Sequence, residues 1–352
     1  MNAILCGPET SMPANARDTV EHPATTLRVA HRSDLRSTRA SLLRDLRGIS
    51  RPLARVAARV MRQRDLLTPP AIGELWPWLI GDLASLPSAE VQKVSKAWLA
   101  IYLYTLLLDK QCDEPSDSPN PTDALTGALL FEYGLGDFLV MTAGTKWQAT
   151  VRDAVRCSLR DQELDVRMAA RVDDPVCKRQ TAAGKNAGFL MCTAALSALT
   201  QIDKPVLDEF AKSVLLAFQH LDDIADYDDD WRRGNFTPLL IAARGHLANL
   251  DPTVSAKSLI LEGLVISGAL RDILSETKTS VECALQRLSS TSPTAISPNA
   301  PPFFSHLITA LEEAIGGIDR SARLLKESQD DECRRLLLEG IDQRLRIVAQ
   351  QS

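Results

Sequence analysis

The stretch QHLDDIADYDDD, residues 219–230, decides how the rest of the chain is interpreted. Asp222, Asp226 and Asp230 recur every four residues, so a helix here would carry three carboxylates on one face, about 6 Å apart along its axis. Asp223 flanks them. Like charges at this spacing destabilise a bare helix. The spacing therefore predicts a helix that holds a cation.

The types of ligand indicate which cation this would be. Carboxylate oxygens, with no His or Cys among the ligands, favour a hard ion such as Mg2+, which completes its coordination with water and substrate phosphate. Arg232 and Arg233 follow the carboxylates and would suit that phosphate.

A second acidic segment, LLLDKQCDEPSD, closes the apolar run at 91–108. Asp109 and Asp113 share a helical face, and Glu114 lies beside Asp113. Carboxylates at a helix C-terminus oppose the helix dipole unless a cation compensates for them. Because both acidic segments end apolar helices, we predict that they face each other across a bundle and share metal ions.

A third element lies between the two acidic segments in the sequence. Residues 180–199, QTAAGKNAGFLMCTAALSAL, form an apolar pattern of helical period with Lys185 near its start. A lone Lys near a helix start is usually solvated. Between two acidic segments it becomes a candidate ligand for diphosphate.

Helical periodicity dominates the chain, and convincing strand patterns are absent, so we predict an all-α bundle forming one domain over 27–352. Residues 1–26 are rich in Pro and poor in periodic apolar positions, and we expect a disordered extension there. The expected helices are 50–66, 71–84, 91–108, 122–143, 146–170, 178–200, 204–230, 236–247, 254–288, 303–327 and 330–349.

Composition narrows the class of protein. The net charge of −5 argues against nucleic acid as the main partner. No apolar run reaches the roughly 20 residues of a membrane span, and the seven cysteines form no C-x-x-C pair, as in a cytoplasmic protein with reduced thiols. The Arg-rich segment 27–64 indicates a solvated helix face, with a membrane-surface or diphosphate-facing role as alternatives.

The order of these features resembles the trans-prenyl diphosphate synthase and class I terpene synthase superfamily. The match covers roughly 48–245, and its strongest part is Q-x-x-D-D-x-x-D from Gln219, preceded by Phe218 and followed by Gly234-Asn235-Phe236-Thr237. The resemblance implies an isoprenoid synthase bundle with a central active-site cavity, in which three Mg2+ ions hold a prenyl diphosphate. It leaves a homodimer open.

The resemblance also assigns residues. Those at the metal site are Asp109, Asp113, Glu114, Asp222, Asp223 and Asp226, of which Asp109, Asp113, Asp222 and Asp226 would be central to catalysis. Asp230 is predicted to bind metal from the spacing of the carboxylates, but it lies one turn beyond the family's usual ligands, and ordering of Arg232 or Arg233 is its alternative role. Those that would bind the substrate are Lys185, Gln219, Arg232 and Arg233, with Tyr104, Phe189 and Phe218 as aromatic candidates. Ordinary core packing is the alternative role of each aromatic residue. A bulky residue at the position of Tyr104 implies a C10 or C15 substrate.

The departures from the family pattern point to one chemistry within it. The first motif reads D-K-Q-C-D, in which Lys110 cannot be a ligand, and 115–130 contains no Arg or Lys. The motif that grips isopentenyl diphosphate survives only as GISRP at 48–52. The lack of basic residues in 115–130 and the reduced motif at 48–52 both affect binding of the second substrate of chain-elongating enzymes.

The sequence therefore favours a class I terpene synthase. Such an enzyme is a lyase that ionises one linear allylic diphosphate, releases diphosphate and forms a terpene hydrocarbon or alcohol. The alternatives are a prenyltransferase, either chain-elongating or acting on another acceptor, and a catalytically silent binding subunit, which Lys110 suggests.

Overall fold

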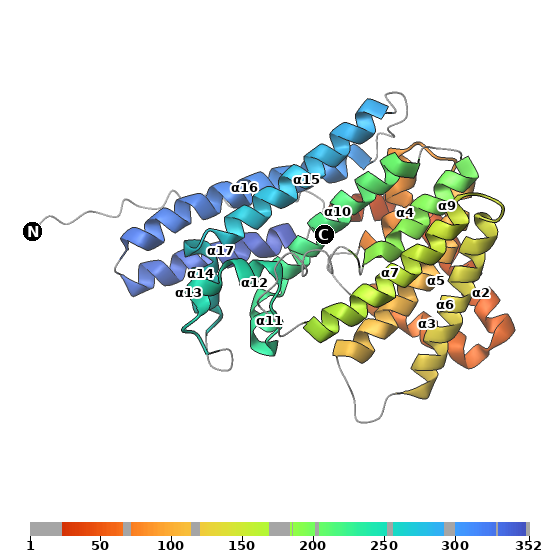
Figure 1. The fold of residues 1–352 in the computed structure, drawn as a ribbon, viewed down its shortest axis with the longest axis horizontal. Coiled ribbons are helices and arrows are strands. Elements are labelled where there is room, and N and C mark those ends of the chain that lie inside the picture. Colours follow the sequence, from red (N-terminus) through yellow and green to blue (C-terminus); the bar gives the residue numbers. More distant parts are fainter. Residues whose placement is uncertain are drawn as a thin grey trace, which may run out of the picture.

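The computed structural model describes residues 23–65, 72–113, 120–168, 184, 186–200, 204–251, 256–291, 300–328 and 330–349. Within these ranges the regular elements are all helices (Figure 1), which confirms the expected all-α fold. In chain order they are α1 Pro23–Ala30, α2 Arg32–Ile49, α3 Arg51–Asp65, α4 Ile72–Leu83, α5 Ser88–Asp113, α6 Pro121–Met141, α7 Trp147–Met168, η1 Asn186–Phe189, α9 Leu190–Thr200, α10 Lys204–Ala225, α11 Tyr227–Arg233, α12 Pro238–Ala242, α13 Arg244–Leu247, α14 Lys257–Ile266, α15 Ala269–Thr291, α16 Ala300–Glu327 and α17 Asp331–Ala349.

Helix α5 lies inside the N-terminal half, where it packs against α2, α4, α6 and α9. It is apolar around much of its circumference, and Val94, Ala97 and Trp98 are buried, as expected for a central helix. Helix α6 approaches it closely at Gly134, where an added Cβ would lie 2.7 Å from the carbonyl oxygen of Ala97. Glycine at this position therefore permits the tightest contact of the two helices.

The C-terminal half is built on α10. This helix packs along α15, with α16 and α17 beside them, and Figure 1 shows α15, α16 and α17 running together at one side of the molecule. Helix α9 contacts both α5 and α10, so it joins the two halves.

Four expectations about the elements were wrong. Helices α1 and α2 were not expected, although Leu35, Leu42 and Leu46 of α2 fall on one buried face. The expected helix 204–230 divides at Asp226, the helix 254–288 divides at Ser267 and Gly268, and the segment 236–247 forms the two short helices α12 and α13. Gly268 has φ +83, a left-handed conformation that ends a helix readily in glycine.

The Arg-rich segment is more than a solvated face. Arg39 makes two hydrogen bonds of 2.5 Å with the buried carboxylate of Glu74 in α4, and Arg59 donates to Asp123 of α6 at 2.7 Å. Arg51 and Arg55 are exposed, as expected. Part of this segment therefore ties α2 and α3 to the rest of the bundle through ion pairs.

By length and composition alone, helix α6 is long and apolar enough to cross a membrane. The sequence was not expected to contain such a segment. Core helices of globular proteins pass the same test. Helix α6 packs against α5 and α3, while Leu125 and Val140 are exposed on it.

Candidate functional site

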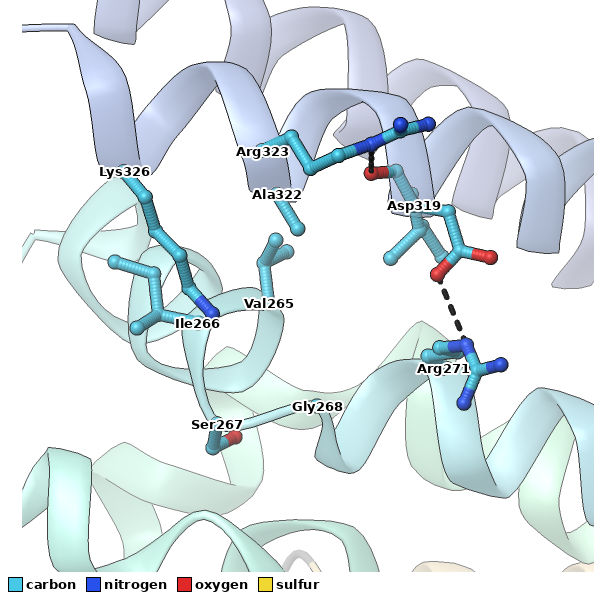
Figure 2. Close-up of a pocket in the computed structure, with 10 residues that line it drawn as sticks. Val265, Ile266, Ser267, Gly268, Arg271, Asp319, Ala322, Arg323 and Lys326 are labelled. Atoms are coloured by element: carbon cyan, nitrogen blue, oxygen red, sulfur yellow. Dashed lines mark hydrogen bonds and ion pairs between the residues drawn. The ribbon is translucent and has the colours of Figure 1, made fainter.

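A pocket of about 450 Å³ lies between the α14–α15 turn and the second half of α16 (Figure 2). Its lining includes Arg271, Arg323 and Lys326, and Arg271 pairs with Asp319 at 2.9 Å. No residue that the sequence predicted for the site lines it. The candidate site is therefore the acidic end of α10.

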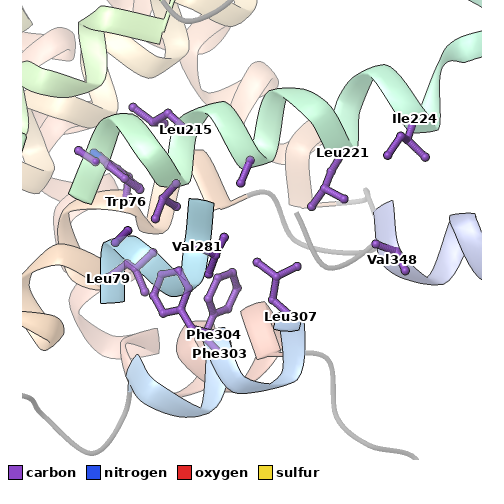
Figure 3. Close-up of a cluster of buried hydrophobic side chains, with 14 of the residues drawn as sticks. Trp76, Leu79, Leu215, Leu221, Ile224, Val281, Phe303, Phe304, Leu307 and Val348 are labelled. Atoms are coloured by element: carbon purple, nitrogen blue, oxygen red, sulfur yellow. The ribbon is translucent and has the colours of Figure 1, made fainter. Parts of the chain in front are cut away.

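The orientation of α10 follows from its apolar face. Figure 3 shows Leu221 and Ile224 pointing from this helix toward Leu307 of α16 and Val348 of α17, and all four residues are buried. With that face fixed in the core, the polar positions in the last turns of α10 are directed elsewhere. Asp222, between the buried Leu221 and Ile224 in sequence, is exposed.

The three carboxylates predicted to share a helical face keep their spacing across the break between α10 and α11. They are Asp222, Asp226 and Asp230. The amide of Asp226 donates to the carbonyl of Asp222 at 3.0 Å, and the amide of Asp230 donates to the carbonyl of Asp226 at 2.9 Å. Asp226 itself lies between the helices with φ −107 and ψ 10. The helix that was predicted to be continuous is therefore bent at Asp226.

Helix α11 is explained by its own sequence. Asp228, Asp229 and Asp230 occupy its first turn and Arg232 and Arg233 its last turn, which is the arrangement that the helix dipole favours. Gly234 ends the helix with φ +69, a left-handed conformation that costs a residue with a Cβ more. These three acids, of which only Asp230 was predicted to bind metal, are thus stabilised by local structure.

Asp230 orders a different residue from the one expected. We predicted that it binds metal, with ordering of Arg232 or Arg233 as the alternative. Its Oδ1 accepts a 2.8 Å hydrogen bond from Nδ2 of Asn235, and its carbonyl accepts from the Asn235 amide at 2.8 Å. Arg232 lies 3.4 Å from Asp228 and 3.8 Å from Asp229.

Gln219 connects the acidic end of α10 to η1. Its Nε2 donates to Oδ1 of the buried Asp223 at 3.0 Å, and its Oε1 accepts from Nδ2 of Asn186 at 3.3 Å. Asn186 directly follows Lys185, which lies outside the described residues. Asn186 was not predicted from the sequence, although an amide next to a candidate phosphate ligand was a signal.

Gly184, on the other side of Lys185, lies against α7. A Cβ at this position would overlap the Oδ2 atom of the buried Asp161, so the close approach requires glycine. The chain on both sides of Lys185 is therefore held near α7 and α10.

The carboxyl group of Asp226 is in an unfavourable setting. Partial burial raises its pKa, and so do the charges of Asp222, Asp229 and Asp228, while Arg233 acts in the opposite direction. A cation beside Asp222 and Asp226 would relieve this repulsion.

The first acidic segment is described only in its backbone. Helix α5 extends through Asp109 to Asp113, whose side chains, like Glu114, lie outside the described residues. Lys110 is exposed. In Figure 1 the ends of α5 and α7 and helix α11 lie at the same lower side of the molecule.

Among the side chains that the structure describes, no three His, Cys, Asp or Glu are grouped to hold a metal ion. That the two acidic segments share metal ions stays a prediction, because the described groups do not include Asp109 and Asp113.

The aromatic candidates are half-buried and pack on other rings. Phe189 lies 4.5 Å from Trp98 between ring centroids, Tyr104 lies 5.0 Å from Phe131 of α6, and Phe218 lies 6.3 Å from Phe303 of α16. Core packing accounts for these contacts. A role in stabilising a cation stays a prediction.

His220 also has a packing role. The Nδ1 atom of its buried ring lies 3.1 Å from the hydroxyl oxygen of Thr277. This contact links α10 to α15. Because that hydroxyl donates to the carbonyl of Ile273, it accepts from Nδ1 of His220.

Comparisons with known proteins give one kind of match. No protein-family pattern and no curated protein sequence matches the chain. Among solved structures, a polyprenyl synthase from Roseobacter denitrificans is similar with a TM-score of 0.62 and 16% identity, over 83% of this chain and 99% of that one.

Two further solved structures are similar at the same level. A polyprenyl synthase from Caulobacter crescentus CB15, complexed with calcium and isoprenyl diphosphate, has a TM-score of 0.56 and 19% identity, over 78% of this chain and 98% of that one. A geranylgeranyl pyrophosphate synthase from Lactobacillus brevis has a TM-score of 0.58 and 16% identity, over 91% and 100%. This chain therefore has the all-helical fold of these polyprenyl and geranylgeranyl pyrophosphate synthases.

Proposed function

We propose that this protein is a metal-dependent prenyltransferase, which ionises an allylic prenyl diphosphate and joins the prenyl group to a second substrate. The observation that carries the proposal is the acidic end of α10, where Asp222 and Asp226 lie close enough to repel each other. The solved structures that share the fold are synthases, and they favour transfer over the cyclisation that the sequence favoured.

The ligand chemistry fits Mg2+. The donors at the end of α10 are all carboxylate oxygens, the type this ion takes together with substrate phosphate. Bound there, Mg2+ would withdraw electron density from the diphosphate and stabilise it as a leaving group. The calcium and isoprenyl diphosphate of the Caulobacter crescentus structure support a divalent ion as the type of cofactor.

In this proposal, other residues of the chain supply charge, hold a carboxylate in place or bind the diphosphate. Asp222 and Asp226 supply negative charge at the solvent-accessible end of α10, and Gln219 holds Asp223 in place from within the bundle. The Arg233 guanidinium, whose charge acts on Asp226, is available to the diphosphate. In the proposed reaction the allylic C–O bond breaks, and both of its electrons leave with the diphosphate.

Cyclisation is the second candidate, and a specific observation favours it. The segment 115–130 contains no Arg or Lys. Its Asp123 accepts a 2.7 Å hydrogen bond from Arg59, which belongs to α3. A diphosphate of a second substrate would meet an acidic region there unless α3 supplied the positive charge.

Product analysis separates the two candidates. We would incubate the protein with Mg2+ and the C10, C15 or C20 allylic diphosphate, with and without isopentenyl diphosphate, and identify products by mass spectrometry. A product longer by five carbons that requires isopentenyl diphosphate supports chain-elongating transfer; a hydrocarbon or alcohol formed from the allylic substrate alone supports cyclisation and overturns transfer.

The same assay includes two controls. Chelation of divalent ions by EDTA should abolish turnover, and Asp226→Asn should lower it by orders of magnitude. Failure of the wild-type protein to consume any of these substrates in the presence of Mg2+ would reject both candidates and leave the non-catalytic binding subunit.

A further inference from the structure

Helix α11 is held by a residue more than one hundred positions later in the chain. Asp342 of α17 accepts a hydrogen bond from Nζ of Lys257 at 3.0 Å and from the hydroxyl of Tyr227 at 3.4 Å, both through Oδ1. Its Oδ2 accepts from Arg346 at 2.9 and 3.0 Å. One carboxylate therefore connects α11, α14 and α17.

Lys257 extends this connection to the next residue of α11. Its Nζ lies 3.8 Å from Oδ1 of Asp228 and 5.1 Å from the centroid of the Tyr227 ring. Tyr227 and Asp228 are the two residues that directly follow Asp226. Both are thus held by side chains from outside the acidic motif.

The charges of this network are defined by their surroundings. Burial opposes the ionisation of Asp342, but the hydrogen bonds and charges of Lys257 and Arg346 outweigh it and lower the pKa of that carboxyl. The hydroxyl of Tyr227 is the donor in its contact with this carboxylate. Each contact therefore pairs a defined donor with a defined acceptor.

Helix α11 needs such support. It has seven residues, and a helix of this length is not stable by itself. Its inner face consists of Tyr227, 1% exposed, and Trp231, 6% exposed, whose ring packs on Phe236 at 5.8 Å. The Tyr227 hydroxyl on that face donates to Asp342.

We propose that Asp342 is a positioning residue, which sets the direction of α11 relative to α10 through Tyr227 and Lys257. The direction of α11 fixes the backbone on the C-terminal side of Asp226 and hence the geometry of the metal-binding carboxylates. This inference rests on the proposed function. Groups that hydrogen-bond directly to metal ligands change metal affinity about 10- to 100-fold when removed, and Asp342 acts one contact further away, so we take the lower end of this range.

The test compares Asp342→Ala with Glu339→Gln in the full-length protein. Glu339 lies on the same helix, is exposed and pairs with Arg335 of that helix, so its replacement controls for changes in α17 itself. We expect Asp342→Ala to raise the Mg2+ concentration for half-maximal turnover about 10-fold or more. Glu339→Gln should leave it at the wild-type value.

A second readout does not need turnover. Mg2+ together with inorganic diphosphate should raise the melting temperature of the wild-type protein, and this rise should be smaller in Asp342→Ala at the same ligand concentrations. Asp342→Asn keeps an oxygen acceptor for Tyr227 and Lys257 and should recover part of the response, which a general loss of stability would not explain.

The outcomes separate the inference from the proposed function. If Mg2+ and inorganic diphosphate do not stabilise the wild-type protein, the proposed function fails. If they do, and Asp342→Ala has the wild-type Mg2+ dependence, the positioning role is overturned. Should Asp342→Ala not fold, Asp342→Asn and Tyr227→Phe decide, and an unchanged Mg2+ dependence in both overturns it.

Discussion

Two neighbouring groups of aspartates differ in what stabilises them. Asp222 and Asp226 stand at the C-terminal end of α10 and in the bend after it, where the helix dipole is unfavourable to negative charge. Asp228 and Asp229 stand in the first turn of α11, where the dipole is favourable and Arg232 lies within 3.8 Å of both.

This difference separates acids that help to form the fold from the acids to which we assign the cation in the proposed function. The acids of α11 have partners within the protein, including Lys257 for Asp228 and Asn235 for Asp230. Asp226 has its pKa raised by burial and by its acidic neighbours. In the proposed function, position relative to a helix end, more than the count of acids, therefore selects the carboxylates that would bind metal.

The largest effect should come from exchanging one acid in each group. We expect Asp226→Asn to lower turnover about 10²- to 10³-fold, the scale seen when one electrostatic contact to the transition state is removed. Asp229→Asn should stay near the wild-type rate, because Asp229 is exposed in the first turn of α11. Steady-state kinetics at saturating Mg2+ measures both, and equal losses would contradict the division into two groups.

The acidic end of α5 should behave like the end of α10. Asp109→Asn is expected to lower turnover by about two orders of magnitude if its carboxylate shares the metal site. Lys110→Gln, at the exposed neighbouring position, is the matched control and should have little effect. A Mg2+ dependence unchanged by Asp109→Asn would count against metal ions shared between the two segments.

The end of α11 tests how far local structure stabilises this region. Gly234→Ala places a Cβ at φ +69 and should reduce the free energy of unfolding by about 1–2 kcal/mol. Gly136→Ala, within α6 and with open space around its Cβ position, should be neutral or stabilising. Urea denaturation measures both variants, and equal changes would exclude a special role for the Gly234 conformation.

The smallest effect concerns stability without metal. In EDTA, Asp226→Asn should stabilise the protein, whereas Asp228→Asn should destabilise it by a few tenths to about 1 kcal/mol, because Asp228 loses Arg232 and Lys257. Thermal unfolding of both variants gives the two signs.

The pH dependence of the Asp226 effect follows from its raised pKa. The folded protein favours the protonated carboxyl, so its stability falls as pH rises from the ordinary Asp pKa of 3.8 through the raised value. The advantage of Asp226→Asn should therefore be present above this interval and disappear below it. An advantage that persists at lower pH would have another cause than charge.

Much of the fold could be predicted because apolar periodicity is a local signal. It located α3, α4, α6, α7, α16 and α17 within a few residues. It failed for α2, where frequent arginines hid the spacing of Leu35, Leu42 and Leu46. It also failed at Asp226 and Gly268, where a single residue bends or ends a helix without interrupting the apolar pattern.

The sequence by itself determined the all-α fold and the group of acids from which the candidate site is drawn, since both depend on spacing along the chain. Only the tertiary structure decided that the acids divide at Asp226 and that Gln219 connects to Asn186. It also supplied Lys257 and Asp342 as partners of α11. These contacts join distant helices, and a seven-residue helix takes its direction from such contacts because its own hydrogen bonds are too few to fix it.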